Sequence, residues 1–258
     1  MLLKMNYTLL SLYATLFTFL LTALGASMVF FIRRINKNFM DATLGIAAGI
    51  MMSASFWSLL KPAIDNAKDL KQVVWFVVSL GFVIGGVFIF LTDKIFQKKF
   101  KNKSSKNKRI FLMILSITMH NIPEGLAVGI AFGSVKYHLK GASLTNAIAL
   151  AIGIGIQNFP EGSAVSLPLR SEKYSRWKAF ALGSLSAIVE PIFGVIGALL
   201  TIKIRTLMPI FLSFAAGAMI YVVVEELIPE SQSNKNKALM TLFTLIGFTI
   251  MMILDVAM

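Results

Sequence analysis

The chain alternates between long apolar stretches and short polar connections. About 20 consecutive apolar residues in a helix cross the hydrocarbon core of a bilayer, and each stretch is roughly that long. The stretches lie approximately at 7–32, 39–64, 72–96, 110–135, 144–168, 179–202, 207–230 and 238–258. This pattern predicts an all-α integral membrane protein in which residues 1–258 form a single transmembrane domain of eight helices.

Composition agrees with this prediction. Of the 258 residues 57% are hydrophobic and only 14% are charged, whereas a soluble domain carries roughly a quarter charged residues. The chain has no cysteine, so disulfides and thiolate metal sites are excluded.

The basic residues predict the orientation of the chain. Lys and Arg gather at 33–37, 97–109, 170–178 and 235–237, which lie on one side of an eight-helix arrangement. Loops rich in Lys and Arg remain in the cytoplasm, so both termini are expected outside it. We expect 97–109 to be a flexible cytoplasmic loop that contacts lipid headgroups. Because the net charge of +13 resides in short loops, we expect no nucleic-acid partner.

Two near-duplicate hexapeptides carry acidic residues inside apolar stretches. Residues 120–125 read His-Asn-Ile-Pro-Glu-Gly, and residues 157–162 read Gln-Asn-Phe-Pro-Glu-Gly. A carboxylate in hydrocarbon costs a few kcal/mol unless it is paired or serves a charged partner. A single motif could be structural, with its glutamate paired to a lysine or an amide. Neither apolar span contains a basic residue, and the arrangement occurs twice, which favours a cation site.

Helical spacing groups the polar residues of each motif. The donors are His120, Asn121 and Glu124 in the first motif, and Gln157, Asn158 and Glu161 in the second. In each motif the first donor and the glutamate are four residues apart and therefore share a helix face. Imidazole with carboxylates suits Zn²⁺, Fe²⁺, Mn²⁺ or Cd²⁺.

The prolines and glycines of the motifs predict local geometry. Pro123 and Pro160 cannot donate a backbone hydrogen bond, so the fourth and fifth helices should kink and expose a carbonyl near mid-membrane. Gly125 and Gly162 follow directly and permit close approach of a neighbouring helix. We therefore expect the two kinked helices to form a central metal site.

Further polar residues extend the candidate site. Glu190 precedes Pro191, where another kink is expected. Glu225 and Glu226 are adjacent, so at most one of them faces a transport path squarely. Ser58 belongs to a set of serines that could line a polar route or could equally make backbone hydrogen bonds.

At these motifs the chain resembles the ZIP family of divalent-metal transporters, in particular its bacterial GufA-like branch. The resemblance implies a binuclear centre. It assigns one metal to His120, Glu124, Gln157 and Glu161, and a second to Asn121, Asn158 and Glu190, with the motif glutamates bridging. It also implies an entrance at Ser58 and Asp65 and a release route at Glu225 and Glu226. Many relatives carry His at the place of Gln157, and some carry a carboxylate at that of Asn158, which leaves occupancy of the second position open.

The expected function is ATP-independent import of Zn²⁺, or of Cd²⁺, Fe²⁺ or Mn²⁺, through the cell membrane by alternating access. The chain has no phosphate-binding loop for a nucleotide, and no cofactor or enzyme activity is expected. Close-packing glycines such as Gly45 with Gly49 and Gly81 with Gly85, together with the resemblance, point to a homodimer. A membrane-embedded metalloenzyme and a metal sensor are the alternatives, although the His-Glu-x-x-His helix of zinc proteases is absent.

Overall fold

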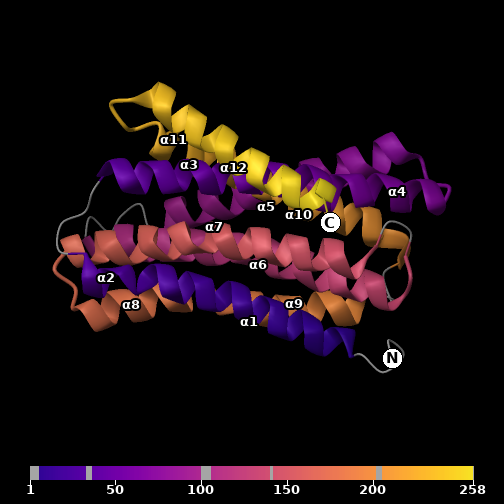
Figure 1. Cartoon of the computed structure of the whole chain (residues 1–258), viewed down its shortest axis with the longest axis horizontal. Helices are drawn as coiled ribbons and strands as arrows, with labels where there is room; N and C mark the ends of the chain where they lie inside the picture. Colours follow the sequence, from indigo (N-terminus) through magenta and orange to yellow (C-terminus); the bar gives the residue numbers. More distant parts are fainter. Residues whose placement is uncertain (1–5, 33–36, 100–105, 140–141, 202–204, 258) are drawn as a thin grey trace.

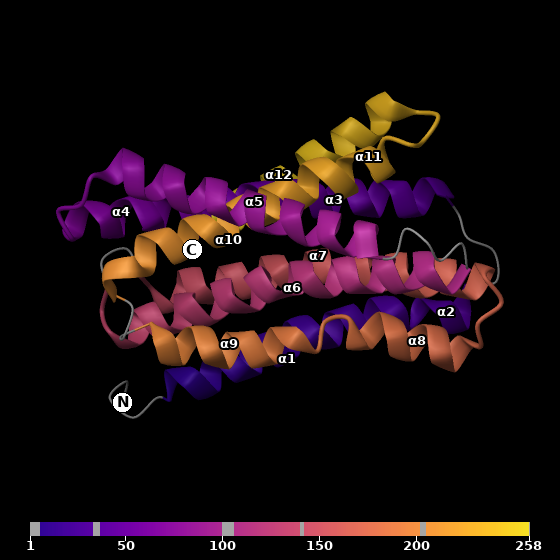
Figure 2. The same ribbon diagram turned by 180° about the vertical axis from the view of Figure 1, so that it is seen from behind.

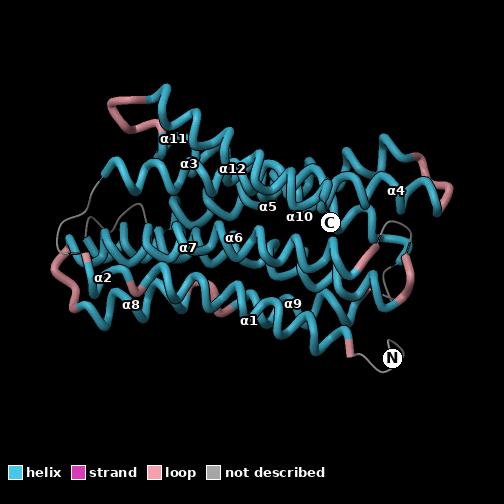
Figure 3. Tube along the Cα trace, viewed as in Figure 1, coloured by secondary structure: helices cyan, strands magenta, loops and turns pink. Residues whose placement is uncertain are grey.

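The protein folds entirely into helices in the part of the chain that its computed structural model describes. This part comprises residues 6–32, 37–99, 106–139, 142–201 and 205–257. Figure 3 shows helices joined by short turns, without strands in these ranges.

The helices run back and forth along one long bundle (Figure 1). In chain order they are α1 Tyr7–Ala26, α2 Met28–Phe31, α3 Lys37–Ala54, η2 Ser55–Leu60, α4 Lys61–Asp69, α5 Val74–Lys99, α6 Lys106–Lys136, α7 Leu144–Ser171, α8 Arg176–Leu185, α9 Val189–Leu200, η3 Arg205–Leu207, α10 Met208–Val222, η4 Val223–Leu227, α11 Ile228–Ser231 and α12 Lys237–Ala257. Helix α1 begins and α12 ends toward the same end of the bundle.

Six helical segments within the described ranges are long and apolar enough to cross a membrane. They are Tyr7–Phe31, Lys37–Asp69, Val74–Ile95, Arg176–Leu200, Arg205–Ser231 and Lys237–Ala257. The prediction of a helical membrane protein is therefore confirmed. Helices α6 and α7 are 31 and 28 residues long, but the polar residues of the two motifs lower their apolar character.

The predicted bounds of the loop 97–109 are wrong at both ends. Helix α5 continues through Lys99, and α6 begins at Lys106. Lys and Gln are good helix formers, so the helices extend beyond their apolar stretches into the basic segment. Residues 100–105 lie outside the described residues.

The helices form two groups, one above the other in Figures 1 and 2. The first group contains α3, η2, α4, α5, α10, η4, α11 and α12, and the second contains α1, α2, α6, α7, α8 and α9. The most extensive helix pairs, α3 with α12, α5 with α10, α1 with α7 and α6 with α9, all lie within a group.

Glycines bring the backbones within each group into direct contact. A Cβ at Gly49 of α3 would collide with the Thr244 carbonyl of α12, and one at Gly129 of α6 would collide with the Gly194 carbonyl of α9. The predicted packing role of Gly49 is therefore confirmed. Such approach is typical of membrane helices, where van der Waals packing holds neighbours together.

Contacts between the groups are of a different kind. Helix α3 packs on α7, and α10 packs on α6. At Gly153 of α7 the neighbour from the other group is the flexible thioether of Met251 on α12. The groups thus meet partly through adaptable side chains, whereas each group is held internally by backbone contact.

Two widened helical turns precede prolines in the first group. The π-helical turn η2 ends at Leu60, directly before Lys61-Pro62. The second turn, η4, ends at Leu227, directly before Ile228-Pro229. Proline lacks the backbone donor for the regular ladder, and π turns of this kind are frequent at functional sites. These turns set the direction of Ser58 and Glu226.

We predict that Gly49→Ala lowers the thermal stability of the purified protein, because the added methyl group meets backbone that cannot move aside. Overpacking of this kind costs about 1–3 kcal/mol. Gly86→Ala is the matched control, since a Cβ there lies 3.6 Å from the Gly217 carbonyl oxygen, an ordinary contact. Equal denaturation midpoints for both variants in detergent would contradict the close packing of α3 on α12.

Candidate metal centre

The two hexapeptides lie on α6 and α7, which pack against each other. Both helices continue without interruption past Pro123 and Pro160. Their kink angles stay a prediction. The glycines behave as predicted: a Cβ at Gly125 would lie 2.6 Å from the carbonyl oxygen of Glu190, and one at Gly162 would collide with the Thr22 carbonyl. The motifs are therefore pressed against α9 and α1.

A buried hydrogen bond joins the two motifs directly. Gln157 Nε2 donates to Glu124 Oε1 at 2.6 Å. Both side chains have no exposed surface. The first donor of one motif thus meets the glutamate of the other, which brings the two predicted ligand faces together.

A second buried group surrounds Glu190. Asn158 Nδ2 donates to Glu190 Oε1 at 2.8 Å, and the Thr18 hydroxyl on α1 donates to Glu190 Oε2. Nearby, Asn121 Nδ2 donates to the carbonyl oxygen of Ser186 at 3.1 Å. Ser186 belongs to residues 186–188, which separate α8 from α9, so the expected interruption before Pro191 exists and places Glu190 in the first turn of α9.

The glutamate of the second motif, Glu161, is the third carboxylate of the cluster. Glu161 is buried. Its charge interacts with those of Glu124 and Glu190. Negative charges this close in an apolar bundle repel one another unless a cation or protons intervene. The cluster is therefore suited to a cation.

Four buried oxygen atoms in this region accept no hydrogen bond from any described residue. They are Asn121 Oδ1, Glu124 Oε2, Gln157 Oε1 and Asn158 Oδ1. A buried acceptor without a partner costs about 1–3 kcal/mol, so such a concentration needs a compensating partner. Every one of these oxygens belongs to a residue that the sequence predicts as a ligand.

The His120 side chain lies outside the described side chains. Among those that are described, no three His, Cys, Asp or Glu residues form a group ready to hold a metal. The described donors are instead carboxylates interleaved with amides, and the imidazole assigned by the resemblance stays a prediction.

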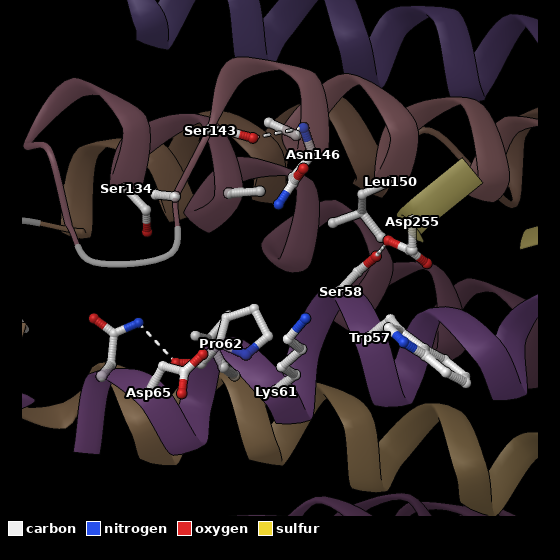
Figure 4. Close-up of a pocket in the computed structure, with 15 residues that line it drawn as sticks. Trp57, Ser58, Lys61, Pro62, Asp65, Ser134, Ser143, Asn146, Leu150 and Asp255 are labelled. Atoms are coloured by element: carbon white, nitrogen blue, oxygen red, sulfur yellow. Dashed lines mark hydrogen bonds between the residues drawn. The ribbon is translucent and has the colours of Figure 1, made fainter. Parts of the chain in front are cut away.

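Ser58 and Asp65 line one cavity of about 360 Å³. Its walls come from η2, α4, α6, α7, α10 and α12, and thus from both helix groups (Figure 4). It lies at the end of the bundle where α4 and the connection from α6 to α7 are found. Ser58 Oγ donates to Asp255 Oδ1 at 2.6 Å.

The adjacent residues Glu225 and Glu226 separate as expected for neighbours on a helix. Glu226 is partly buried and its charge interacts with that of Glu161. Glu225 is exposed and lines an apolar groove on the outside of the bundle between α5 and α10. Of the two, Glu226 is the residue whose charge acts on Glu161.

Comparison with known proteins now adds to this geometry. A family model described as "ZIP Zinc transporter" matches residues 8–109 and 101–255. The chain belongs to the ZIP family. Zinc transporter ZIP11 of Xenopus tropicalis is 37% identical over 96% of this chain and 97% of its own length. Zinc transporter ZIPB of Bordetella bronchiseptica is 34% identical over 93% and 78%, respectively.

The predicted family resemblance is confirmed. Zinc transporter GufA of Myxococcus xanthus, which shares its name with the branch that the motifs resemble, is 30% identical over 92% of this chain and 94% of its own length. The ZIP family consists of transporters rather than enzymes, and these similarities extend over nearly the whole chain.

Sequence reasoning missed three residues of this ZIP-family site. Thr18 and Ser186 hydrogen-bond predicted ligands, and Asp255 joins Ser58. A signal for Thr18 was present, because the buried α1 residues Ser11, Thr15, Thr18 and Thr22 recur at helical spacing. Asp255 gave no comparable signal. It lies near the end of an apolar stretch, where charged residues are common in membrane helices.

We predict that Thr18→Val lowers the free energy of unfolding by about 1–3 kcal/mol, because the buried Glu190 loses a donor. Thr18→Ser should retain most of the stability. Thr15→Val is the matched control, since the Thr15 hydroxyl donates to the Ser11 carbonyl of its own helix at 2.8 Å. Thermal denaturation in detergent measures the difference, and a Thr18→Val midpoint equal to wild type would contradict the contact.

Proposed function

We propose that this chain imports divalent transition metal, foremost Zn²⁺, with Cd²⁺, Fe²⁺ and Mn²⁺ as further substrates. The observation that carries the proposal is the set of buried oxygens without partners beside three mutually interacting carboxylates on α6, α7 and α9. The names of the relatives, which are zinc transporters, support zinc as the first substrate to test.

The two metal positions differ in their local hydrogen bonds. At the first, the residues His120, Glu124, Gln157 and Glu161 would hold the ion, with Glu124 Oε2 and Gln157 Oε1 supplying free acceptors. At the second, Asn121, Asn158 and Glu190 are the donors. There the free acceptors are the neutral amide oxygens of Asn121 and Asn158, because the Asn158 amide nitrogen and the Thr18 hydroxyl already occupy both oxygens of Glu190. We therefore propose tighter binding at the first position.

We further propose that α6 and α7 cross the membrane along with the six apolar segments, which gives eight crossings of the cell membrane and a single transmembrane domain over residues 1–258. Both termini would lie outside the cytoplasm. This orientation is supported by the described basic segments 170–178 and 235–237, which lie at the end of the bundle opposite the start of α1.

Two other predicted partners have different support. The exposed apolar faces of α5 and α12 suit membrane lipid. The glycines that pointed to a homodimer, however, pack inside the chain: Gly49 against α12 and Gly85 against α10. A homodimer therefore rests on the family resemblance alone.

The proposed route leads from the cavity at Ser58, Asp65 and Asp255 to the carboxylate cluster and then past Glu226 to the cytoplasm. The membrane potential can drive this direction. It contributes roughly 2.3 kcal/mol per charge per 100 mV, which is doubled for an uncompensated divalent ion. No nucleotide is required.

Alternating access would occur by movement of one helix group against the other. This is supported by the contrast between backbone contacts within groups and the Met251 contact between them. The cavity spans both groups, so relative movement would open or close it. The buried cluster lies mainly on the second group and would be carried with it.

The metalloenzyme alternative is weakened by the same contacts. A hydrolase needs an open metal position and a base that is not a ligand. Glu124 and Glu190 are each engaged by an amide of the site, and Glu161 completes the proposed ligand set. A sensor would bind metal without moving it, and transport measurements distinguish that alternative.

We predict saturable zinc uptake into proteoliposomes without ATP that is abolished by Glu124→Ala and by Glu161→Ala, because each substitution removes a ligand of the proposed first position. Radioactive zinc measures uptake, with Cd²⁺, Fe²⁺ and Mn²⁺ as competitors. Glu230→Ala, at an exposed position of α11, is the control that should transport normally. Stoichiometric zinc binding without uptake by folded wild type would favour a sensor.

We predict that cross-linking the two helix groups stops uptake. The chain has no native cysteine, so engineered pairs report cleanly. A Cβ at Gly153 would lie 3.7 Å from Met251 Cγ, which makes Gly153→Cys with Met251→Cys a suitable pair across the groups. The control pair, Asn38→Cys with Asn234→Cys, lies within one group, where these side chains hydrogen-bond at 2.9 Å.

A short, cleavable thiol cross-linker should inhibit only the first pair, and cleavage of the linker should restore uptake. Normal uptake by both cross-linked pairs would instead support a channel-like path.

A further inference from the structure

One lysine lies among the acidic residues of the cavity between the two helix groups. Among the described residues, the titratable side chains that line this cavity are Lys61, Asp65 and Asp255. A basic residue opposes metal entry if the cavity is the entrance for a divalent cation, as proposed above. Its presence there therefore needs a physical reason.

Helical spacing and one hydrogen bond place Lys61 between the two carboxylates. Lys61 and Asp65 are four residues apart on α4 and share a face, and Ser58 precedes Lys61 by three residues. The Ser58 hydroxyl binds Asp255 Oδ1 at 2.6 Å. Figure 4 shows the Lys61 side chain pointing into the cavity between Asp65 and Ser58.

Neither carboxylate is neutralised by a close contact with this lysine. Among the described residues no salt bridge joins Lys61 to Asp65 or Asp255, although the Lys61 charge acts on Asp255. The atom Asp255 Oδ2 is buried and has no hydrogen-bond partner among the described residues. The ammonium group thus acts on the Asp255 carboxylate without a direct ion pair to it.

The other polar groups of the cavity are oxygen donors of the kind that hard cations prefer. Ser58, Ser134 and Asn146 line it together with the two aspartates. Ca²⁺ binds six to eight such oxygens, and Mg²⁺ also favours carboxylates and water. Without a positive charge, this cavity would be suited to retain abundant hard divalent ions.

We propose that Lys61 is a specificity-determining residue that denies Ca²⁺ and Mg²⁺ a stable site at the entrance. Its ammonium group competes with them for Asp65 and Asp255. The net charge of the three groups remains negative, so a divalent cation is still attracted. A transition metal continues to the deeper site on α6 and α7, where the proposed His120 imidazole would favour it over a hard ion. This proposal rests on the proposed transport function.

A binding measurement tests Lys61 without transport. Tb³⁺ is a luminescent substitute for Ca²⁺ that tryptophan sensitises, and Trp57 lines the cavity. Purified Lys61→Met should bind Tb³⁺ about tenfold more tightly than wild type, and Ca²⁺ should displace it. Lys61→Arg keeps the charge and should behave as wild type. Lys61→Gln repeats the neutral substitution if Lys61→Met folds poorly.

Two further variants locate the new site. Adding Asp65→Asn or Asp255→Asn to Lys61→Met should remove the gain in Tb³⁺ affinity. Adding Trp57→Phe should reduce the sensitised emission. Equal Tb³⁺ affinity of wild type and both neutral variants would overturn the proposal, as would a gain that survives loss of the aspartates.

Transport provides the second readout. Millimolar external Ca²⁺ should leave zinc uptake by wild type and Lys61→Arg unchanged. In Lys61→Met it should raise the apparent KM for zinc several-fold without a change in kcat, as expected for competition at an entrance. If wild type takes up zinc normally and calcium does not affect uptake by the neutral variants, the proposed role of Lys61 is refuted while the transport function stands. Absence of wild-type uptake would count against the transport function, and the Tb³⁺ result would still decide the binding role.

Discussion

The structure depends on the burial of three carboxylates inside an apolar helix bundle. Glu124, Glu161 and Glu190 are buried and their charges interact, and each costs several kcal/mol there without compensation. Amides and a hydroxyl on α7 and α1 offset part of this cost. In the function proposed above, the remaining unpartnered oxygens would supply the binding energy for a divalent cation, so the arrangement that weakens the fold would support transport.

Close helix packing makes this arrangement possible. Gly125 and Gly162 follow the two motif glutamates, and each removes the side chain that would hold α9 or α1 away. The backbone of Glu190 and the hydroxyl of Thr18 can then approach the site. Because such contacts join helices within a group and flexible side chains meet between groups, the packing also suggests where the bundle can move. The cavity with Lys61 lies on that boundary.

Much of the fold and of the site could be predicted from the sequence. Long apolar stretches specify membrane helices because a bilayer requires them to satisfy their own backbone. The repeated motif indicated which glutamates would be buried together. Two carboxylates in apolar helices repel each other, so they can be buried side by side only if they share a cation or take up protons. The low hydropathy of the basic segment after residue 96, however, predicts a loop there. Its Lys and Gln residues are good helix formers, so α5 continues to Lys99. Hydropathy alone does not mark where a helix ends.

The sequence by itself determined the class of protein, because its apolar stretches have the length of membrane helices. Its paired motifs indicated the family by resemblance, and they marked the polar residues of α6 and α7 that the structure buries together. The tertiary structure decided which distant residues complete them. Thr18 and Asp255 are more than a hundred residues from Glu190 and Ser58, respectively, and spacing along one helix carries no information about such pairs. The same holds for Glu225 and Glu226, since their adjacency along the chain does not tell which of them interacts with Glu161.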